Sequence, residues 1–233
     1  MPSGRNYRTV KNRRFGPTIR FFVLLAVLAL FLPIYAASAA NANDRAGKNI
    51  RLLVLGDSLV AGYGLPKVEN FTVRLAQALT DRNITATVIN AGVSGDTTTG
   101  GKSRLGWALA DKPDAVILEL GANDGLRGIE PMVSLANLDA IITRLKNNKI
   151  KVLLAGMKAP PNLGKEYSAE FNRIFPALAD KHNLIFYPFF LEGVAANPNL
   201  NQEDKIHPNA DGVDEIVKRI LPRVLELIGS FGE

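Results

Sequence analysis

The chain has 233 residues, enough for one domain with a full hydrophobic core, and it contains no cysteine. Disulfide bonds, a thiol nucleophile and cysteine-ligated zinc are therefore excluded, and two distant histidines argue against a histidine-rich metal site. The formal charge of +6 comes from six basic residues within residues 1–40, because the other 22 Lys and Arg equal the 22 Asp and Glu in number. We therefore expect no nucleic-acid partner.

Residues 1–40 are typical of a secretory signal peptide. Basic residues precede the apolar run 21–32, Pro33 ends this run, and residues 37–39 supply the small-x-small pattern that predicts cleavage near 39–40. Twelve apolar residues are short for a membrane span. An uncleaved signal anchor remains the alternative, since weakly apolar residues continue after the proline. In both cases we expect a periplasmic or secreted protein.

Residues 41–49 are polar and small, and are predicted to be a linker before one folded domain at residues 50–233. Five short apolar runs within this domain predict strands at residues 50–55, 86–91, 115–120, 151–156 and 184–187. Apolar residues at helical spacing predict helices that include residues 71–79, 135–145, 171–178 and 213–221. Pro222 is predicted to kink or end the last of these helices.

Alternating strands and helices predict a three-layer α/β/α sandwich around a central parallel sheet of about five strands. Sites in such sheets form beyond the carboxyl ends of the strands. Ser58, residues 92–95 and residues 121–124 each follow a predicted strand, so we expect them to converge on one edge. Glu119 lies inside the third apolar run, where a buried carboxylate needs a partner that the sequence does not identify.

Ser58 is the candidate nucleophile, because a hydroxyl at the end of a strand becomes reactive when a base lies within hydrogen-bond reach. His207 is the preferred base, and Asp204 three residues earlier is placed to accept its Nδ1–H. Pro208 suits the first position of a helix, which predicts that His207 lies in a fixed turn. His182 is predicted to be a solvated surface residue.

Acyl transfer also needs donors for the developing oxyanion, and uncharged, preorganised groups serve best. The N–H groups of Ser58 and Gly95 and the side-chain amide of Asn123 are the candidates. Taken singly, Gly95 and Asn123 are equally well explained as turn residues. Asp57 and Asp96 are predicted to cap the turns that follow them.

Four blocks of the sequence occur in the order typical of one family of enzymes. These are Gly-Asp-Ser-Leu at 56–59, Ser-Gly-Asp-Thr at 94–97, Gly-Ala-Asn-Asp at 121–124 and Asp-x-x-His-Pro at 204–208. The chain thus resembles the SGNH/GDSL hydrolases, and within them the bacterial periplasmic multifunctional esterases. Ala122 departs from the pattern, because the third block usually begins with two glycines.

The resemblance implies a flavodoxin-like sandwich and a serine esterase without metal or cofactor. It implies Ser58 as nucleophile, His207 as base, Asp204 as its orienting group, and Gly95 and Asn123 as oxyanion donors. It also implies that residues 121–128 form a loop that closes over the acyl chain. The expected substrates are aryl esters, lysophospholipids and acyl thioesters.

Apolar residues after the predicted strands are the only sequence clue to the substrate. Leu126, Met157, Pro160 and Phe189 are predicted to line a groove for an acyl or aryl group, although core packing explains some of them equally well. Arg127 is predicted to be solvated, with contact to a substrate headgroup as the alternative.

The sequence is compatible with other functions. A carbohydrate O-acetylesterase would use the same catalytic residues, a non-catalytic lipid- or glycan-binding module would use the same cleft, and a membrane-tethered scaffold would require the uncleaved anchor. We expect a monomer whose membrane contact is limited to an uncleaved leader.

Overall fold

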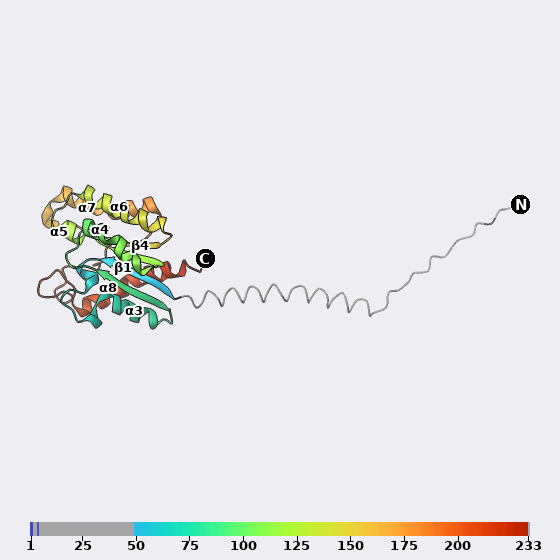
Figure 1. Cartoon of the computed structure of the whole chain (residues 1–233), viewed down its shortest axis with the longest axis horizontal. Coiled ribbons are helices and arrows are strands. Elements are labelled where there is room, and N and C mark those ends of the chain that lie inside the picture. The colour runs from blue at the N-terminus through green and yellow to red at the C-terminus, as the bar shows by residue number, and fades with distance from the viewer. Residues whose placement is uncertain (2–3, 5–48, 233) are drawn as a thin grey trace. The chain divides into compact units, whose positions relative to one another are not determined.

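The computed structural model describes residues 49–232 together with Met1 and Gly4, and residues 49–232 belong to one compact unit (Figure 1). The predicted leader and most of the predicted linker lie outside the described residues. Among the helices of the described part, none is long and apolar enough to cross a bilayer.

The centre of this unit is a five-stranded sheet in the order β2-β1-β3-β4-β5, and every paired strand is parallel. The strands are β1 (Ile50–Gly56), β2 (Ala86–Gly92), β3 (Ala115–Glu119), β4 (Lys151–Ala155) and β5 (Ile185–Tyr187). Residues 52–55 are fully buried, as expected for a central strand covered on both faces. The predicted parallel sheet is confirmed, and each strand lies within about one residue of its predicted bounds.

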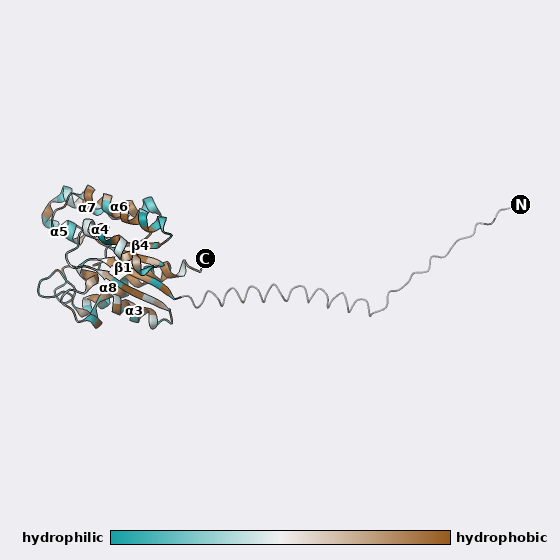
Figure 2. Ribbon diagram, viewed as in Figure 1, coloured by the Kyte–Doolittle hydropathy of each residue, from teal (hydrophilic) through white to brown (hydrophobic). Residues whose placement is uncertain are grey.

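Helices cover both faces of the sheet (Figure 1). One layer contains α3 (Phe71–Thr80) and α8 (Ala210–Gly229), and the other contains α4 (Thr98–Ala108), α6 (Pro131–Asn147) and α7 (Lys165–His182). Short elements complete the unit: α2 (Ser58–Ala61), α5 (Ala122–Leu126), and the 3₁₀ turns η1 (Lys67–Glu69), η2 (Leu109–Asp111) and η3 (Pro161–Leu163). Hydrophobic residues concentrate along the strands and on helix faces (Figure 2), which confirms the predicted sandwich.

Two helices differ from the prediction. Pro222 does not end α8, because Val224 and Leu227 extend the buried apolar stripe beyond the proline and tertiary packing outweighs the local cost. Helix α4 has no amphipathic signal in the sequence, since its buried positions include Thr98 and Gly101 as well as Leu105. It begins with Thr97 as the capping residue, whose side chain accepts the N–H of Gly100.

Both ends of this unit lie at the amino edge of the sheet. Ile50 is the first residue of β1, and the side-chain amine of Lys151, the first residue of β4, donates to the backbone carbonyl of Ser230 just after α8. Ser58 follows the opposite end of β1. The two ends are therefore separated from the carboxyl edge of the sheet by the length of its strands.

Gly92, at the carboxyl end of β2, should be the least replaceable glycine near Ser58. A Cβ there would lie 2.3 Å from the backbone nitrogen of Ala61 in α2, the helix that begins at Ser58. We expect Gly92→Ala to lower the free energy of unfolding by about 2–3 kcal/mol, because backbone cannot move aside as a side chain can. Denaturant unfolding measures this; Gly229→Ala, where no atom lies within 4 Å, is the control and should change little.

Candidate active site

Ser58 lies where the central strand β1 ends and helix α2 begins, at the carboxyl edge of the sheet. Asp57 is fully buried, and its carboxylate accepts the backbone N–H of Leu59 at 3.0 Å, which confirms the predicted cap. The strand order reverses at β1, because β2 lies on one side and β3 on the other. Ser58 therefore occupies the position where open α/β sheets form their sites.

His207 reaches Ser58 from the long connection between β5 and α8. Its Nε2 lies 3.0 Å from the Ser58 Oγ, and its Nδ1 lies 2.7 Å from Oδ2 of Asp204. The other Asp204 oxygen accepts the backbone N–H groups of Ile206 and His207 at 2.9 and 3.0 Å. The structure thus joins the three predicted side chains in one hydrogen-bonded chain.

These contacts keep Asp204 ionised. Its pKa is lowered to about 2, first by the backbone N–H of His207 and then by the His207 side chain. Asp204 therefore remains an acceptor for Nδ1–H throughout the neutral pH range, which fixes the tautomer that leaves Nε2 facing Ser58. Pro208 does not begin the helix as predicted, because Asn209 caps α8 and Pro208 precedes this cap. The turn is held instead by Asp204.

The prediction for His182 was wrong. Its side chain is only 12% exposed, and its Nε2 lies 2.6 Å from Asp139 Oδ1, which also accepts Lys181. The three groups connect α6 to the end of α7, and the hydrogen bonds from Lys181 and His182 lower the pKa of Asp139. His182 is thus a helix-packing residue, and it does not line the cavity beside Ser58.

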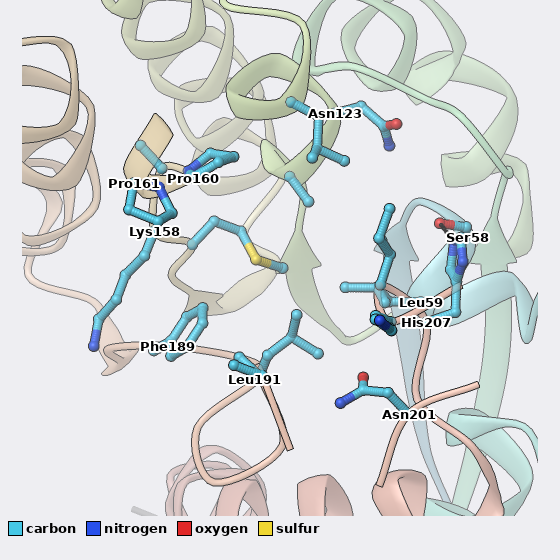
Figure 3. A pocket seen from close by; sticks show the side chains of 18 residues that line it. Ser58, Leu59, Asn123, Lys158, Pro160, Pro161, Phe189, Leu191, Asn201 and His207 are labelled. Atoms are coloured by element: carbon cyan, nitrogen blue, oxygen red, sulfur yellow. Dashed lines mark hydrogen bonds between the residues drawn. The ribbon is translucent and has the colours of Figure 1, made fainter. Parts of the chain in front are cut away.

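Asn123, in helix α5 after β3, donates its side-chain amide to Oδ2 of Asp57 at 3.1 Å. This bond uses one N–H of the amide and orients the side chain, which lines the same cavity as Ser58 (Figure 3). Burial raises the pKa of Asp57 to about 6, although the bonds from Leu59 and Asn123 oppose that rise.

Glu119 in β3 holds the turn before Ser58 by a hydrogen bond. It is fully buried, and one oxygen accepts the Asp57 backbone N–H at 3.2 Å, which supplies the partner that the sequence did not identify. The other oxygen has no hydrogen-bond partner within the described residues. Burial, together with the nearby charge of Asp57, holds the pKa of Glu119 well above its usual range.

Arg104 in α4 holds the same turn through its guanidinium group. Its guanidinium donates to the carbonyl oxygens of Gly56 and Ala91, each at 2.8 Å, at the carboxyl ends of β1 and β2. It also pairs with Asp96. The prediction that Asp96 caps a turn was therefore wrong, since Thr97 takes the capping position of α4.

Asp124 is a buried structural anchor. Its carboxylate accepts the Thr98 N–H at 2.8 Å and both the Thr98 and Ser134 hydroxyls, which joins α5 to the start of α4 and to α6. Arg127 is exposed, and it donates to the carbonyl oxygen of Gly95 at 2.8 Å. Gly95 itself is exposed and does not line the cavity beside Ser58.

A cavity of about 420 Å³ opens beside Ser58 and His207. The four predicted substrate-contacting residues, Leu126, Met157, Pro160 and Phe189, all line it. Figure 3 labels Pro160 and Phe189 among them. Lys158 lies at the end remote from Ser58, with its Nζ 4.6 Å from the centre of the Phe189 ring and 3.8 Å from Glu192. The cavity is thus mainly apolar, and its charged lining residues are Lys158 at that end and Lys205 in the His207 loop.

Several contributors escaped the sequence reasoning. Asn201 lines the cavity, Arg104 and Glu119 hold the turn before Ser58, and Tyr63 contacts the ring of His207. Only Tyr63 leaves a local signal, because it stands between two glycines five residues after Ser58. The others are brought to the site by contacts that no local pattern records.

A serine, a histidine and an aspartate, hydrogen-bonded in series at the carboxyl edge of a parallel sheet, define a serine hydrolase of the three-layer α/β/α class. The profile of the GDSL-like lipase/acylhydrolase family matches residues 54–214. The chain belongs to this family and is a carboxylic ester hydrolase of the serine esterase type.

Named relatives agree with this assignment. The chain is 41% identical over 190 residues to an arylesterase of Vibrio mimicus, covering 81% of this chain and 91% of the relative. It is 36% identical over 200 residues to thioesterase 1/protease 1/lysophospholipase L1 of Escherichia coli K12, covering 84% and 91%. The solved psychrotrophic esterase EstA of Pseudoalteromonas sp. matches with a TM-score of 0.74 at 31% identity, covering 78% of this chain and 100% of that one.

Proposed function

We propose that the enzyme hydrolyses aryl esters and lysophospholipids, and also acyl thioesters, through an acyl-enzyme on Ser58. The observation that carries this proposal is the chain of contacts from Asp204 through His207 to Ser58 beside a mainly apolar cavity of about 420 Å³. A cavity of this kind suits an acyl or aryl group, and the polar groups at one end place the ester carbonyl.

In the proposed reaction, the Ser58 Oγ attacks the ester carbonyl while His207 Nε2 takes the hydroxyl proton. The resulting imidazolium donates its Nδ1–H to Asp204, which remains charged. Collapse of the tetrahedral intermediate expels the alcohol, which receives the proton from Nε2. A water molecule, deprotonated by His207, then attacks the acyl-enzyme, and collapse of the second tetrahedral intermediate releases the acid and returns the proton to Ser58.

The proposed oxyanion donors are the backbone N–H groups of Ser58 and Gly95 and the side-chain amide of Asn123. Support for Asn123 comes from its bond to Asp57, which leaves a second N–H on the same nitrogen. Support for Gly95 is indirect: Arg127 ties its carbonyl to the end of the helix that carries Asn123.

Asn123→Ala should lower kcat by about 10²–10³-fold, because an oxyanion donor acts mainly on the transition state. Hydrolysis of p-nitrophenyl butyrate measures this, and KM should change far less than kcat. A thermal unfolding curve separates this effect from misfolding. A folded variant whose kcat stays within tenfold of the wild type would remove Asn123 from the proposed role.

A substrate panel tests the function itself. Purified protein should hydrolyse p-nitrophenyl esters with six to ten acyl carbons, and should act on lysophosphatidylcholine. Activity confined to acetyl esters would favour a carbohydrate O-acetylesterase. A fluorophosphonate should label Ser58, as suggested by the inhibition of the relative EstA by monoethylphosphonate. Absence of both labelling and turnover would favour a non-catalytic lipid-binding module.

We also propose that residues 1–40 are an export leader cleaved near residues 39–40, that 41–49 are a linker, and that 50–233 are the hydrolase domain. The order of basic, apolar and small residues supports the leader. Amino-terminal sequencing of the exported protein tests the cleavage, and a mature chain that begins at Met1 would contradict it.

A further inference from the structure

We propose that Tyr63 is a positioning residue for the catalytic base: it holds the ring of His207 in place and stabilises its protonated form during turnover. The two ring centres lie 4.5 Å apart, with 36° between the ring planes. This inference rests on the proposed role of His207 and adds a residue that no sequence block singles out. Tyr63 does not line the cavity beside Ser58, so its contact is with the histidine.

The backbone around Tyr63 is built to present its ring. Gly62 and Gly64 on either side have φ values of +80° and +73°, a region that glycine adopts without strain. The N–H of Tyr63 donates to the carbonyl oxygen of Ser58 at 3.1 Å. The turn is thereby fixed to the first residue of α2.

Gln202 joins this turn to the histidine segment. Its side-chain amide donates to the carbonyl oxygens of both Tyr63 and Pro208, at 2.8 and 2.9 Å. Its backbone N–H donates to the carbonyl of His207 at 2.8 Å. The Gln202 side chain therefore ties the Tyr63 turn to the residue after His207, and its own backbone is fixed to His207.

Burial does not explain why the Tyr63 ring is held against His207. Tyr63 is exposed, with 53% relative accessibility, whereas the His207 side chain is only 18% exposed. An exposed aromatic ring gains little from the hydrophobic effect, and the ring that it contacts within the described residues is the imidazole.

The contact becomes stronger when the base is charged. His207 becomes an imidazolium each time it takes a proton, first from Ser58 and then from the hydrolytic water. Asp204 binds the edge of this ring, and the electron-rich face of Tyr63 attracts the cation from the side. The other charged groups that face His207 are Asp57 at the end of β1, whose charge interacts with it, and Lys205 in its own loop. Both remain in every variant below.

The test compares Tyr63→Leu with Tyr63→Phe, which keeps the ring and removes only the hydroxyl. Kinetics are measured on p-nitrophenyl butyrate and on methyl butyrate, whose leaving groups are aromatic and alkyl. We expect Tyr63→Leu to lower kcat about two- to fivefold on both esters with KM unchanged. The acid limb of the kcat/KM profile should move to lower pH by about 0.3–0.7 pH units. Tyr63→Phe should stay within about twofold of the wild type.

Three results would overturn the proposal. Equal kinetics for the Leu and Phe variants would show that the ring contributes nothing beyond bulk. An unmoved acid limb would show that Tyr63 does not act on the charged base. A rise in KM confined to the aryl ester would make Tyr63 a substrate contact instead. Fluorophosphonate labelling of the wild type at Ser58 checks the proposed function separately, because the Tyr63 variants do not affect that result.

Discussion

Ser58→Ala should lower kcat for p-nitrophenyl butyrate by about 10⁴–10⁶-fold, the largest effect expected from any single substitution. Without the Oγ no acyl-enzyme forms, and only direct attack by water, assisted by His207 and the proposed oxyanion donors, remains. KM should change little, because the cavity that receives the acyl group is untouched. Steady-state assays at high enzyme concentration measure the residual rate.

Ser103→Ala is a matched control for this experiment. Ser103 is exposed on α4, and its hydroxyl donates only to the carbonyl of Gly100. This variant should keep full activity and full fluorophosphonate labelling, whereas Ser58→Ala should lose the label entirely. Wild-type activity in the Ser58 variant would refute the assignment of the nucleophile.

Asp57→Asn should change activity and stability in opposite directions. In the wild type, the Asp57 carboxylate accepts an N–H of Asn123. An amide at position 57 would instead place its own NH₂ group against that donor. The two amides can pair only if the Asn123 side chain flips, which turns its oxygen toward the place proposed for the oxyanion. We expect kcat to fall by about 10²–10³-fold, as for loss of an oxyanion donor.

Stability should rise in the same variant. The folded state raises the pKa of Asp57 from 3.8 to about 6, so the charged carboxylate opposes folding above that pH. The contribution of Asp57 to the free energy of unfolding of the wild type is fully present below pH 3.8. It is lost as pH rises through about 6. Asp57→Asn should therefore gain about 2–3 kcal/mol at pH 8, and the gain should disappear near pH 4.

Guanidinium unfolding at both pH values measures this difference. Asp180→Asn is the control, because Asp180 is exposed at the end of α7 and its replacement should give a small change without that pH dependence. An Asp57→Asn protein that is less stable than the wild type at pH 8 would contradict the burial argument.

Much of the fold was predictable, because a parallel sheet covered on both faces requires continuous apolar strands. Residues 52–55 and 115–118 are fully buried, so their hydrophobic runs mark the strands directly. Helix α4 was not predictable, since Thr98 and Gly101 occupy buried positions that apolar residues fill elsewhere. The helix does not end at Pro222 for a related reason: a local rule for proline contains no information about the packing of Val224 and Leu227.

The site was predictable where short motifs carry the chemistry. Ser58, Asn123, Asp204 and His207 each follow a strand or precede a helix within such a motif, and the structure brings their side chains together. Arg104 was missed because its role depends on carbonyl groups 13 and 48 residues earlier in the chain. His182 was misjudged because its partner, Asp139, lies 43 residues away on α6.

The amino edge of the sheet is where the hydrolase unit begins and ends, at Ile50 and just beyond Gly229. A fusion partner, an affinity tag or an immobilising surface attached at either end would therefore be joined to the side remote from Ser58. The cavity would remain open to bulky esters in such an arrangement. The same enzyme is thus suited to display on a solid support from either end of the unit without redesign of its substrate entrance.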